Sequence, residues 1–281
     1  MPLDLSLVGH NGSPHVLDYT WKDTALYALG IGAKKDELDY LYEGRGPKVI
    51  PSFAVVPMFA AMLERVVKTG GDLAMVVHGS ERARVHAPFP PSGRALATSK
   101  IDGIYDMRKF AIVMIDTTIQ VNDELVAETR TQIIIRNAGG FGGTTPPKEE
   151  KAAEIPKDRA EPDFRVEEKT TPEQALLYRL SGDLNPLHAD PEFAAKVGFE
   201  QGPILHGLCT YGHMVRHVTK GALGGDASKL TGFGCTFRKP VWPGDTLVTE
   251  GWKLDGGRIA LQVKVKERDE AVCTAAYALS A

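Results

Sequence analysis

The sequence matches itself weakly at a nearly constant offset. The matched landmarks are Pro51 with Pro203, Pro88 with Pro240, and Tyr27 with Tyr178. The first two pairs lie 152 residues apart and the third lies 151 apart. Landmarks that recur in the same order at the same spacing indicate a duplicated unit. A chain of 281 residues is also long for a single hydrophobic core. We therefore expect two related halves.

Each half carries one substantial helix followed by a run of strands. In the second half, residues at helical spacing mark one helix face, namely Leu205, Leu208, Gly212 and Val215. Short turns separate the strands, at 255–257 in the second half and at 122–123 in the first. A helix followed by antiparallel strands packs on one face of a curved sheet. The pattern predicts an α+β fold in which two helix-on-sheet repeats share one continuous antiparallel sheet.

A stretch rich in glycine and proline, and then in charged residues, separates the halves. It spans 138–163 and is nearly free of large apolar residues, which is typical of a linker. We expect a first repeat at 1–140, a linker at 141–163 and a second repeat at 164–281. The segment GGFGG lacks the lysine of a phosphate-binding loop. A flexible or tightly turned connector is therefore favoured over a nucleotide site.

Composition and charge narrow the class of protein. Hydrophobic residues make up 43% and charged residues 25%, and the net charge is -3 without a basic cluster. This argues against a nucleic-acid partner, which requires clustered Lys and Arg. The longest apolar run, at 53–63, is too short to span a membrane. The chain shows no secretory signal and no peroxisomal Ser-Lys-Leu ending, and its three cysteines are widely spaced, so we expect a cytoplasmic protein.

The helix of the first half contains a proline in the segment VIPSFAVVPMF. Because proline is tolerated in the first turn of a helix and not in its interior, we expect this helix to begin at Pro57. It would then be shorter than its counterpart in the second half. Missing helix on one side of a shared sheet would leave room for a long apolar group beside Pro57, Met58 and Phe59.

The segment YRLSGDLNPLHADPEFA, at 178–194, places Asp183, Asn185 and His188 around a proline. A carboxylate, a carboxamide and an imidazole can hold one water from several sides and move its proton. The corresponding positions of the first half hold Ile31, Ala33 and Asp36. The first half therefore lacks these three polar residues. If they were required to form the turn, the first half should carry similar ones, so their absence favours a functional role. The alternative is an ordinary Asx-type turn with a capping aspartate and a surface histidine.

A second cluster lies at the start of the next helix, in GPILHGLCTYGH. Pro203 precedes this helix, and His206 and Gly207 fall near its first turn. Free backbone N–H groups at a helix start carry partial positive charge and can bind an oxyanion, and a glycine lets a ligand approach the backbone. A cluster that holds water and a site that binds an oxyanion together suit the addition of water beside a carbonyl.

These two segments carry a family resemblance. The segment at 178–194 resembles the hydratase 2 signature of the MaoC-like family, and the matching residues are Tyr178, Ser181, Gly182, Asp183, Asn185, Pro186, His188 and Ala194. Further segments resemble two-domain, eukaryotic-type members of that family, among them YALGIGA, ILHGLCTYG and FRKPVWPGD. The resemblance covers nearly the whole chain from about Tyr27.

The resemblance implies a double hotdog fold and (R)-specific 2-enoyl-CoA hydratase activity. This reaction is the reversible addition of water to a trans-2-enoyl-CoA, giving the (3R)-hydroxyacyl-CoA, and it makes the protein a hydro-lyase. Asp183 and His188 would be catalytic, Asn185 would help to place the water, and the N–H of Gly207 would bind the thioester oxygen. The resemblance further implies an acyl-CoA substrate, an acyl tail held by the first half, no cofactor beyond the CoA of the substrate, no metal, and a homodimer.

Other interpretations stay open. The helix histidines His206, His213 and His217 could indicate a metal site, but they lack the acidic residue of an HExxH motif, and partly buried helix histidines are favoured. The basic pair Arg238 and Lys239 could bind CoA phosphates or could simply be solvated. Alternative functions are an acyl-carrier-protein-linked 3-hydroxyacyl dehydratase, a hotdog acyl-CoA thioesterase, and a non-enzymatic acyl-CoA sensor.

Overall fold

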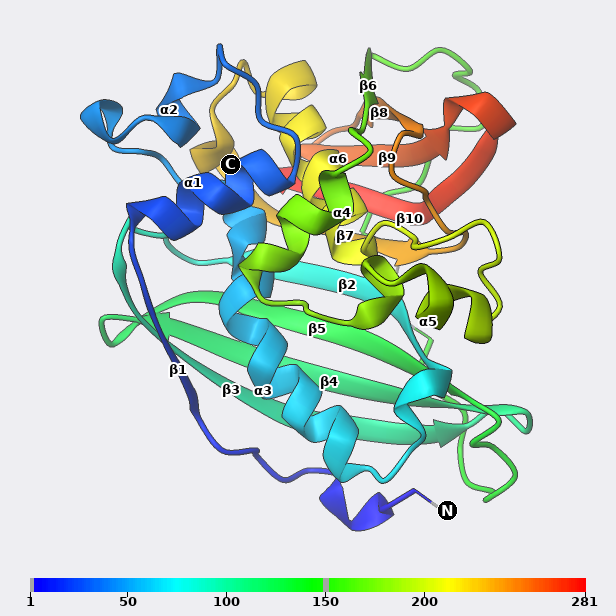
Figure 1. Cartoon of the computed structure of the whole chain (residues 1–281). Helices are drawn as coiled ribbons and strands as arrows, with labels where there is room; N and C mark the ends of the chain where they lie inside the picture. Colours follow the sequence, from blue (N-terminus) through cyan, green and yellow to red (C-terminus); the bar gives the residue numbers. More distant parts are fainter. Residues whose placement is uncertain (1–2, 149–151) are drawn as a thin grey trace.

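A computed structural model of the chain describes residues 3–148 and 152–281 (Figure 1). In these residues, ten strands form a single antiparallel sheet in the order β1-β3-β4-β5-β2-β7-β10-β9-β8-β6. The strands are β1 (His15–Tyr19), β2 (Val76–Val85), β3 (Gly93–Asp106), β4 (Phe110–Val121), β5 (Glu124–Arg136), β6 (Phe164–Lys169), β7 (Leu230–Phe237), β8 (Thr246–Lys253), β9 (Arg258–Val265) and β10 (Glu270–Ser280). The prediction of one continuous sheet is confirmed.

The strand order is the same when it is followed outward from the middle in either direction. The middle pair is β2 with β7, which run antiparallel with Ser80 opposite Thr236 and Arg82 opposite Gly234. From this pair, β5, β4, β3 and β1 follow on one side, and β10, β9, β8 and β6 follow on the other. Corresponding strands of the two halves therefore occupy corresponding places, as a duplicated unit requires.

Each half lays one long helix across its part of the sheet (Figure 1). The helices are α1 (Trp21–Gly30), α2 (Leu38–Leu41), α3 (Val55–Lys68), α4 (Gln174–Tyr178), α5 (Pro191–Lys196) and α6 (Gly207–Ala222). Helix α3 packs on β3, β4 and β5, and α6 packs on β6, β7 and β8. Both helices bury an apolar face, so the core of each half lies between its helix and its strands.

The predicted start of the first-half helix is wrong by two residues. Helix α3 begins at Val55, directly after a 3-10 turn at Pro51–Ala54, and Pro57 does lie in its first turn. Since Val55 corresponds to Gly207 at the repeat offset, both long helices begin at the same place. Helix α3 is shorter only at its far end, with 14 residues against 16 for α6. A shortened helix start therefore gives no room for an acyl tail.

The segment after α1 packs against the second half. Ile31 is fully buried and Ala33 is 7% exposed. Ile31 lies against Gly212 of α6, where any side chain in place of the glycine hydrogen would clash with it. The sulfhydryl of Cys209, also on α6, donates a hydrogen bond to the carbonyl of Gly30 at 3.3 Å. The first-half positions that correspond to Asp183 and Asn185 are thus part of the core beneath α6.

The connection between the halves is held in place at two points. The backbone N–H groups of Gly140 and Gly142 donate to the carboxylate of Asp106 at 2.9 and 2.5 Å. Both glycines have positive φ, so the segment is tightly turned around this carboxylate. Further along, Ala153 is buried against Trp252 of the second half. The part of the predicted linker at 149–151 lies outside the described residues.

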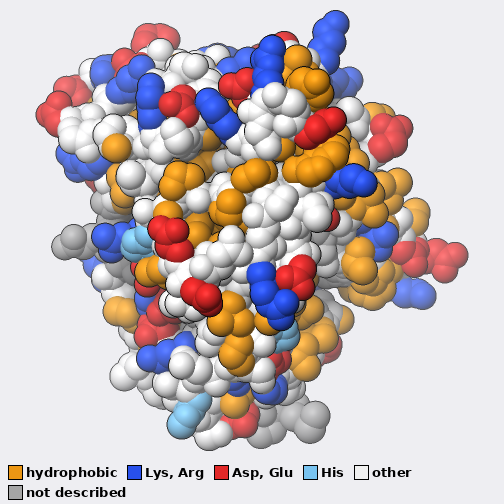
Figure 2. Space-filling model, turned by 90° about the vertical axis from the view of Figure 1, so that its left-hand side faces the viewer, with side chains coloured by type: hydrophobic (Ala, Val, Ile, Leu, Met, Phe, Trp, Pro, Cys, Tyr) orange, Lys and Arg blue, Asp and Glu red, His pale blue; other side chains and the backbone are white. Residues whose placement is uncertain are grey.

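Charges of both signs are interspersed on the surface that Figure 2 shows, with hydrophobic side chains between them. This face, which includes the β1 side of the molecule, carries no extended area of one sign. Among the helices that the structure describes, none has the length and hydropathy needed to cross a membrane.

Candidate active site

The signature segment forms a turn between α4 and α5. Gly182 has a φ of 125°, which favours glycine, and Pro186 starts a 3-10 turn that ends at His188. The carboxylate of Asp183 accepts a hydrogen bond from the N–H of Asn185 at 3.2 Å. The side-chain oxygen of Asn185 in turn accepts from the N–H of Leu187 at 3.0 Å. Two Asx-type turns therefore shape this loop, as the simpler interpretation expected, but the surface histidine of that interpretation is wrong because His188 is buried.

The same turns bring the catalytic candidates together. His188 is 8% exposed, and its Nδ1 lies 2.8 Å from the carbonyl oxygen of Ile204. Because a carbonyl only accepts, Nδ1 carries the proton and Nε2 presents a lone pair. A carboxylate oxygen of Asp183 and ring nitrogens of His188 and His206 lie within 4.8 Å of one another. Asn185 is exposed on the same loop, with its oxygen engaged in the turn.

His206 is the residue of this site to which the sequence assigned no role. Its ring stacks on that of His188, with centroids 3.7 Å apart and planes 26° apart. Its Nε2 lies 3.1 Å from the carbonyl oxygen of Asp183. The ring also contacts that of Tyr178, with centroids 4.9 Å apart and planes tilted by 54°. In the sequence, the feature that points to His206 is its position next to Gly207. Its contact with Asp183 could not be predicted, because the two residues lie 23 positions apart.

Burial keeps both stacked rings neutral. It lowers the pKa of His188, and the neighbouring Asp183 carboxylate and the hydrogen bond to Ile204 offset part of that effect. Burial lowers the pKa of His206 to about 2, with a further contribution from His188. A neutral imidazole near pH 7 can accept a proton from water, which is the first requirement of a general base.

Gly207 begins α6 and faces the ring of Phe237. Its N–H is the first of the helix and has no acceptor within the helix. In the described parts of the chain, no hydrogen bond uses this N–H. A Cβ on Gly207 would lie 3.4 Å from the Phe237 ring, which is an ordinary van der Waals contact. A first helical N–H without an acceptor is the group that the sequence predicts as the oxyanion donor.

The remaining predicted site residues lie apart from this loop. Pro57 and Met58 are buried in α3 and Phe59 is partly buried, and Thr131 places its hydroxyl 3.9 Å from the sulfur of Met58. The basic pair lies just after β7 and is exposed. Its interactions are a hydrogen bond of 2.8 Å from Arg238 Nε to Thr274 and an ion pair of 3.4 Å between Lys239 and Glu270.

The other two helix histidines belong to a separate cluster. His213 and His217 are fully rather than partly buried, and the acidic partner that the helix itself lacks comes from β6. Glu168 lies 3.5 Å from His213 Nδ1 and 3.9 Å from His217 Nε2. Its carboxylate also pairs with Arg216 at 2.8 Å and Lys34 at 3.3 Å. A divalent cation would meet two positive charges there, so the cluster fits an ion network better than a metal site.

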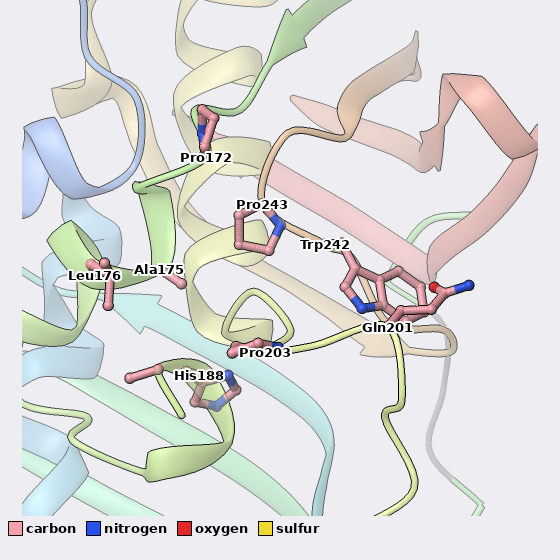
Figure 3. A pocket seen from close by; sticks show the side chains of 9 residues that line it. Pro172, Ala175, Leu176, His188, Gln201, Pro203, Trp242 and Pro243 are labelled. Carbon is pink, nitrogen blue, oxygen red and sulfur yellow. The ribbon is translucent and has the colours of Figure 1, made fainter. Parts of the chain in front are cut away.

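A hollow of about 440 Å³ opens from the surface toward His188 (Figure 3). Its walls are about equally polar and apolar, and the lining residues are Pro172, Ala175, Leu176, His188, Ala189, Gln201, Pro203, Trp242 and Pro243. Trp242 and Gln201 lie on one side of the hollow and Leu176 on the other. Of the predicted catalytic residues, the hollow reaches His188. A second hollow, of about 480 Å³, lies along β2–β5 and includes none of the predicted site residues.

Comparison with family models finds two matches in tandem. Residues 17–137 match the MFE-2 hydratase 2 N-terminal domain, and residues 155–275 match the MaoC like domain. An enoyl-CoA hydratase of Mycobacterium tuberculosis, ChsH3, is 41% identical over 97% of this chain and 96% of its own length.

Comparison with solved structures agrees. A MaoC-like dehydratase from Phytophthora capsici superposes with a TM-score of 0.88 at 29% identity, covering 99% of this chain and 98% of its own. A Mycobacterium tuberculosis protein with a double hotdog fold matches with a TM-score of 0.57 at 16% identity, covering 96% of each chain. The expected double hotdog fold is confirmed. The chain belongs to the MaoC-like family and joins a MaoC-like domain to an N-terminal domain of the MFE-2 hydratase 2 type.

Proposed function

We propose that this protein is an (R)-specific 2-enoyl-CoA hydratase, a hydro-lyase that adds water reversibly to trans-2-enoyl-CoA and gives (3R)-hydroxyacyl-CoA. The observation that carries the proposal is the meeting of the Asp183 carboxylate and the neutral His188 ring; the His206 ring stacks on His188, and the next residue in the chain, Gly207, has a free N–H. Full-length similarity to a protein named enoyl-CoA hydratase supports the same reaction.

The water binds at the Asp183–His188 pair. His188 Nε2 has a lone pair because Nδ1 holds the proton, and one oxygen of Asp183 is left over from the turn. The side-chain amide nitrogen of Asn185 supplies a donor at the edge of the same loop. The pair accepts one proton of the water while the water oxygen bonds to C3 of the enoyl group. The same proton is then delivered to C2, so that one water is added and nothing else is consumed.

The helix start carries the charge that this step creates. As the C3–O bond forms, the electron pair of the C2–C3 double bond moves toward the thioester carbonyl, and its oxygen becomes negative. The N–H of Gly207 and the positive end of the α6 dipole stabilise that oxygen. The apolar ring of Phe237 excludes water beside it, which strengthens the interaction.

The two ends of the substrate are assigned by charge and polarity. We place the acyl tail in the first half at Pro57, Met58 and Phe59; because these side chains pack within α3 and leave no open space, they would have to move apart to admit the tail. Arg238 and Lys239 are exposed and can pair with CoA phosphates. Since the OH group added at C3 and the hydrogen added at C2 both come from water, the chemistry requires no cofactor beyond the CoA of the substrate.

The test is a hydration assay on trans-2-enoyl-CoA over a series of acyl lengths, with chiral analysis of the product. Asp183→Asn and His188→Ala should each lower kcat by about two to four orders of magnitude, because a general acid–base group contributes that much. The matched control is Asp36→Ala, at the first-half position that corresponds to His188; it is exposed and should leave kcat within about twofold. Near-normal turnover in either site variant would contradict the assigned roles. Release of free thiol from acyl-CoA would favour a thioesterase instead.

A further inference from the structure

His206 joins the two parts of the candidate site. Its backbone is the N-cap of α6, where its carbonyl accepts the N–H groups of Cys209 and Thr210 at 3.1 Å each. The next residue, Gly207, supplies the proposed oxyanion donor. The side chain of His206 points toward the loop that carries Asp183 and His188, and it is 1% exposed. One residue therefore touches both the loop that holds the water and the helix start that holds the thioester.

The contacts of the ring fix its chemical form. The Asp183 carbonyl 3.1 Å away can only accept, so Nε2 of His206 carries the proton and donates it. Nδ1 is then a bare acceptor, and it is buried without a hydrogen-bond partner among the described residues. A buried acceptor without a partner is unfavourable. If the position served packing alone, a phenyl ring would fill it without that cost.

The stack with His188 limits both rings. Centroids 3.7 Å apart leave no space for the His188 ring to tilt or flip toward His206, so its Nε2 keeps one direction. Two imidazolium rings at this distance would repel each other strongly in a buried site. Two charged groups act on the pair: the Asp183 carboxylate favours a proton on His188, and Arg179 disfavours a proton on His206.

We propose that His206 is a positioning residue for the hydration reaction, in which its Nε2–H holds the Asp183 backbone in place beside His188. This inference rests on the proposed function. His206 exchanges no proton with substrate; it fixes the distance between the water-binding pair and the N–H of Gly207. Small errors in such distances have large effects on rate, since a displacement of about 1 Å can cost about 100-fold.

Two substitutions separate the hydrogen bond from the ring. His206→Phe keeps an aromatic face and loses the donor. His206→Gln loses the ring, but its amide nitrogen sits at a similar reach from the backbone and can donate to the Asp183 carbonyl. We expect His206→Phe to lower kcat by about 100-fold with KM nearly unchanged, and His206→Gln to recover most of that loss. Circular dichroism and urea unfolding would establish that both variants fold.

The outcomes decide the proposal. If His206→Phe keeps kcat within about threefold of the parent, or if His206→Gln is as slow as His206→Phe, the positioning role through the hydrogen bond is wrong. An independent readout needs no activity: nitrogen-15 NMR of the parent's histidine side chains should show His206 as the Nε2–H tautomer from about pH 5 to about pH 8. Protonation of His206 within that range would also overturn the proposal. If the parent hydrates no trans-2-enoyl-CoA, the proposed function fails, while the NMR result still tests the geometry.

Discussion

At the scale of single residues, the signature loop uses each polar side chain twice. One oxygen of Asp183 accepts the N–H of Asn185, and the oxygen of Asn185 accepts the N–H of Leu187. The second carboxylate oxygen and the amide nitrogen are left for a ligand. The sequence presents an ordinary Asx turn and a water-binding site as alternatives. The structure is compatible with both, because each side chain uses one polar atom in a turn and keeps another for a ligand. The turn is what holds Asp183 near His188 in the absence of regular structure.

The Asp183 carboxylate should tune the basicity of His188. Burial lowers the pKa of His188, and the charge of Asp183 opposes that effect, so Asp183→Asn should lower the pKa further. NMR titration of His188 would measure the change. The matched control is Glu192→Gln, which removes an exposed carboxylate on α5 and should leave the pKa of His188 in place. A rise in this pKa on Asp183→Asn would contradict the electrostatic account.

The sequence predicted the catalytic candidates because they lie within six positions of one another around a proline. It could not predict what the His206 side chain touches, because the partner is 23 positions away and the contact depends on how α6 meets the loop. The surroundings of Met58, Arg238 and Lys239 depend likewise on tertiary structure, so their roles stay predictions.

At the scale of elements, α6 is held by the half of the chain that lacks the signature. Arg216 of α6 is 1% exposed and donates to Glu37 at 2.9 Å and to Glu168 at 2.8 Å. Glu37 follows α1 in the first half and Glu168 lies on β6. Together with Ile31 against Gly212, this ion network fixes the helix whose N-terminus starts the oxyanion site.

Removal of the central cation of this network should be costly. Arg216→Leu would leave the Glu37 carboxylate without its cation and the Glu168 carboxylate with Lys34 alone, both in a mostly buried place, and we expect a loss of about 3–5 kcal/mol in the free energy of unfolding. Urea unfolding would measure it. As a control, Arg94→Ala breaks an ion pair with Asp18 whose side chains are 67% and 70% exposed, and should cost less than about 1 kcal/mol. Equal effects of the two variants would show that the Arg216 network does not carry stability.

Helix and strand positions could be predicted from periodicity and turn residues, and the turns at 122–123 and 255–257 are where expected. The predicted start of α3 at Pro57 is wrong because a proline need not be the first helical residue. Proline is equally acceptable at the third position, since the first N–H groups of a helix have no internal acceptor. The Arg216 network left no local signal, because Arg216 and Glu37 are 179 positions apart.

At the scale of the whole molecule, the fold buries four neutral histidines. His188, His206, His213 and His217 are each at most 8% exposed. Burial lowers the pKa of every one, to about 2 for His206 and to about 3 for His217. Below about pH 6.5, the unfolded chain binds protons that the folded chain does not. Stability that is present near neutral pH is therefore lost as the pH falls.

Each such histidine should remove up to about 1.4 kcal/mol of unfolding free energy per pH unit below about pH 6.5. The buried carboxyl of Glu81 acts in the opposite direction, because burial raises its pKa and the folded state takes up its proton first. Urea unfolding at about pH 7 and about pH 5 would measure the net slope. His213→Phe should reduce the slope of the unfolding free energy with pH by up to the amount that corresponds to one proton. An unchanged slope in this variant would rule out a contribution from His213.

The sequence repeat predicts some features of the whole fold and not others. Paired landmarks predicted the duplication and the shared sheet, because those depend on patterns that persist along the chain. They did not predict that Ile31 and Ala33 are buried. The corresponding segment of the second half is a polar, partly exposed loop, so the repeat alone indicates a loop at these positions too.

That burial has a consequence for the way the two halves depend on each other. The segment at Ile31 packs against the neighbouring half, and Gly212 leaves the space that the Ile31 side chain occupies. An aspartate at position 31 would put a carboxylate into the packing beneath α6, the helix that begins at Gly207. The candidate site in one half therefore requires that the equivalent loop of the other half stay apolar.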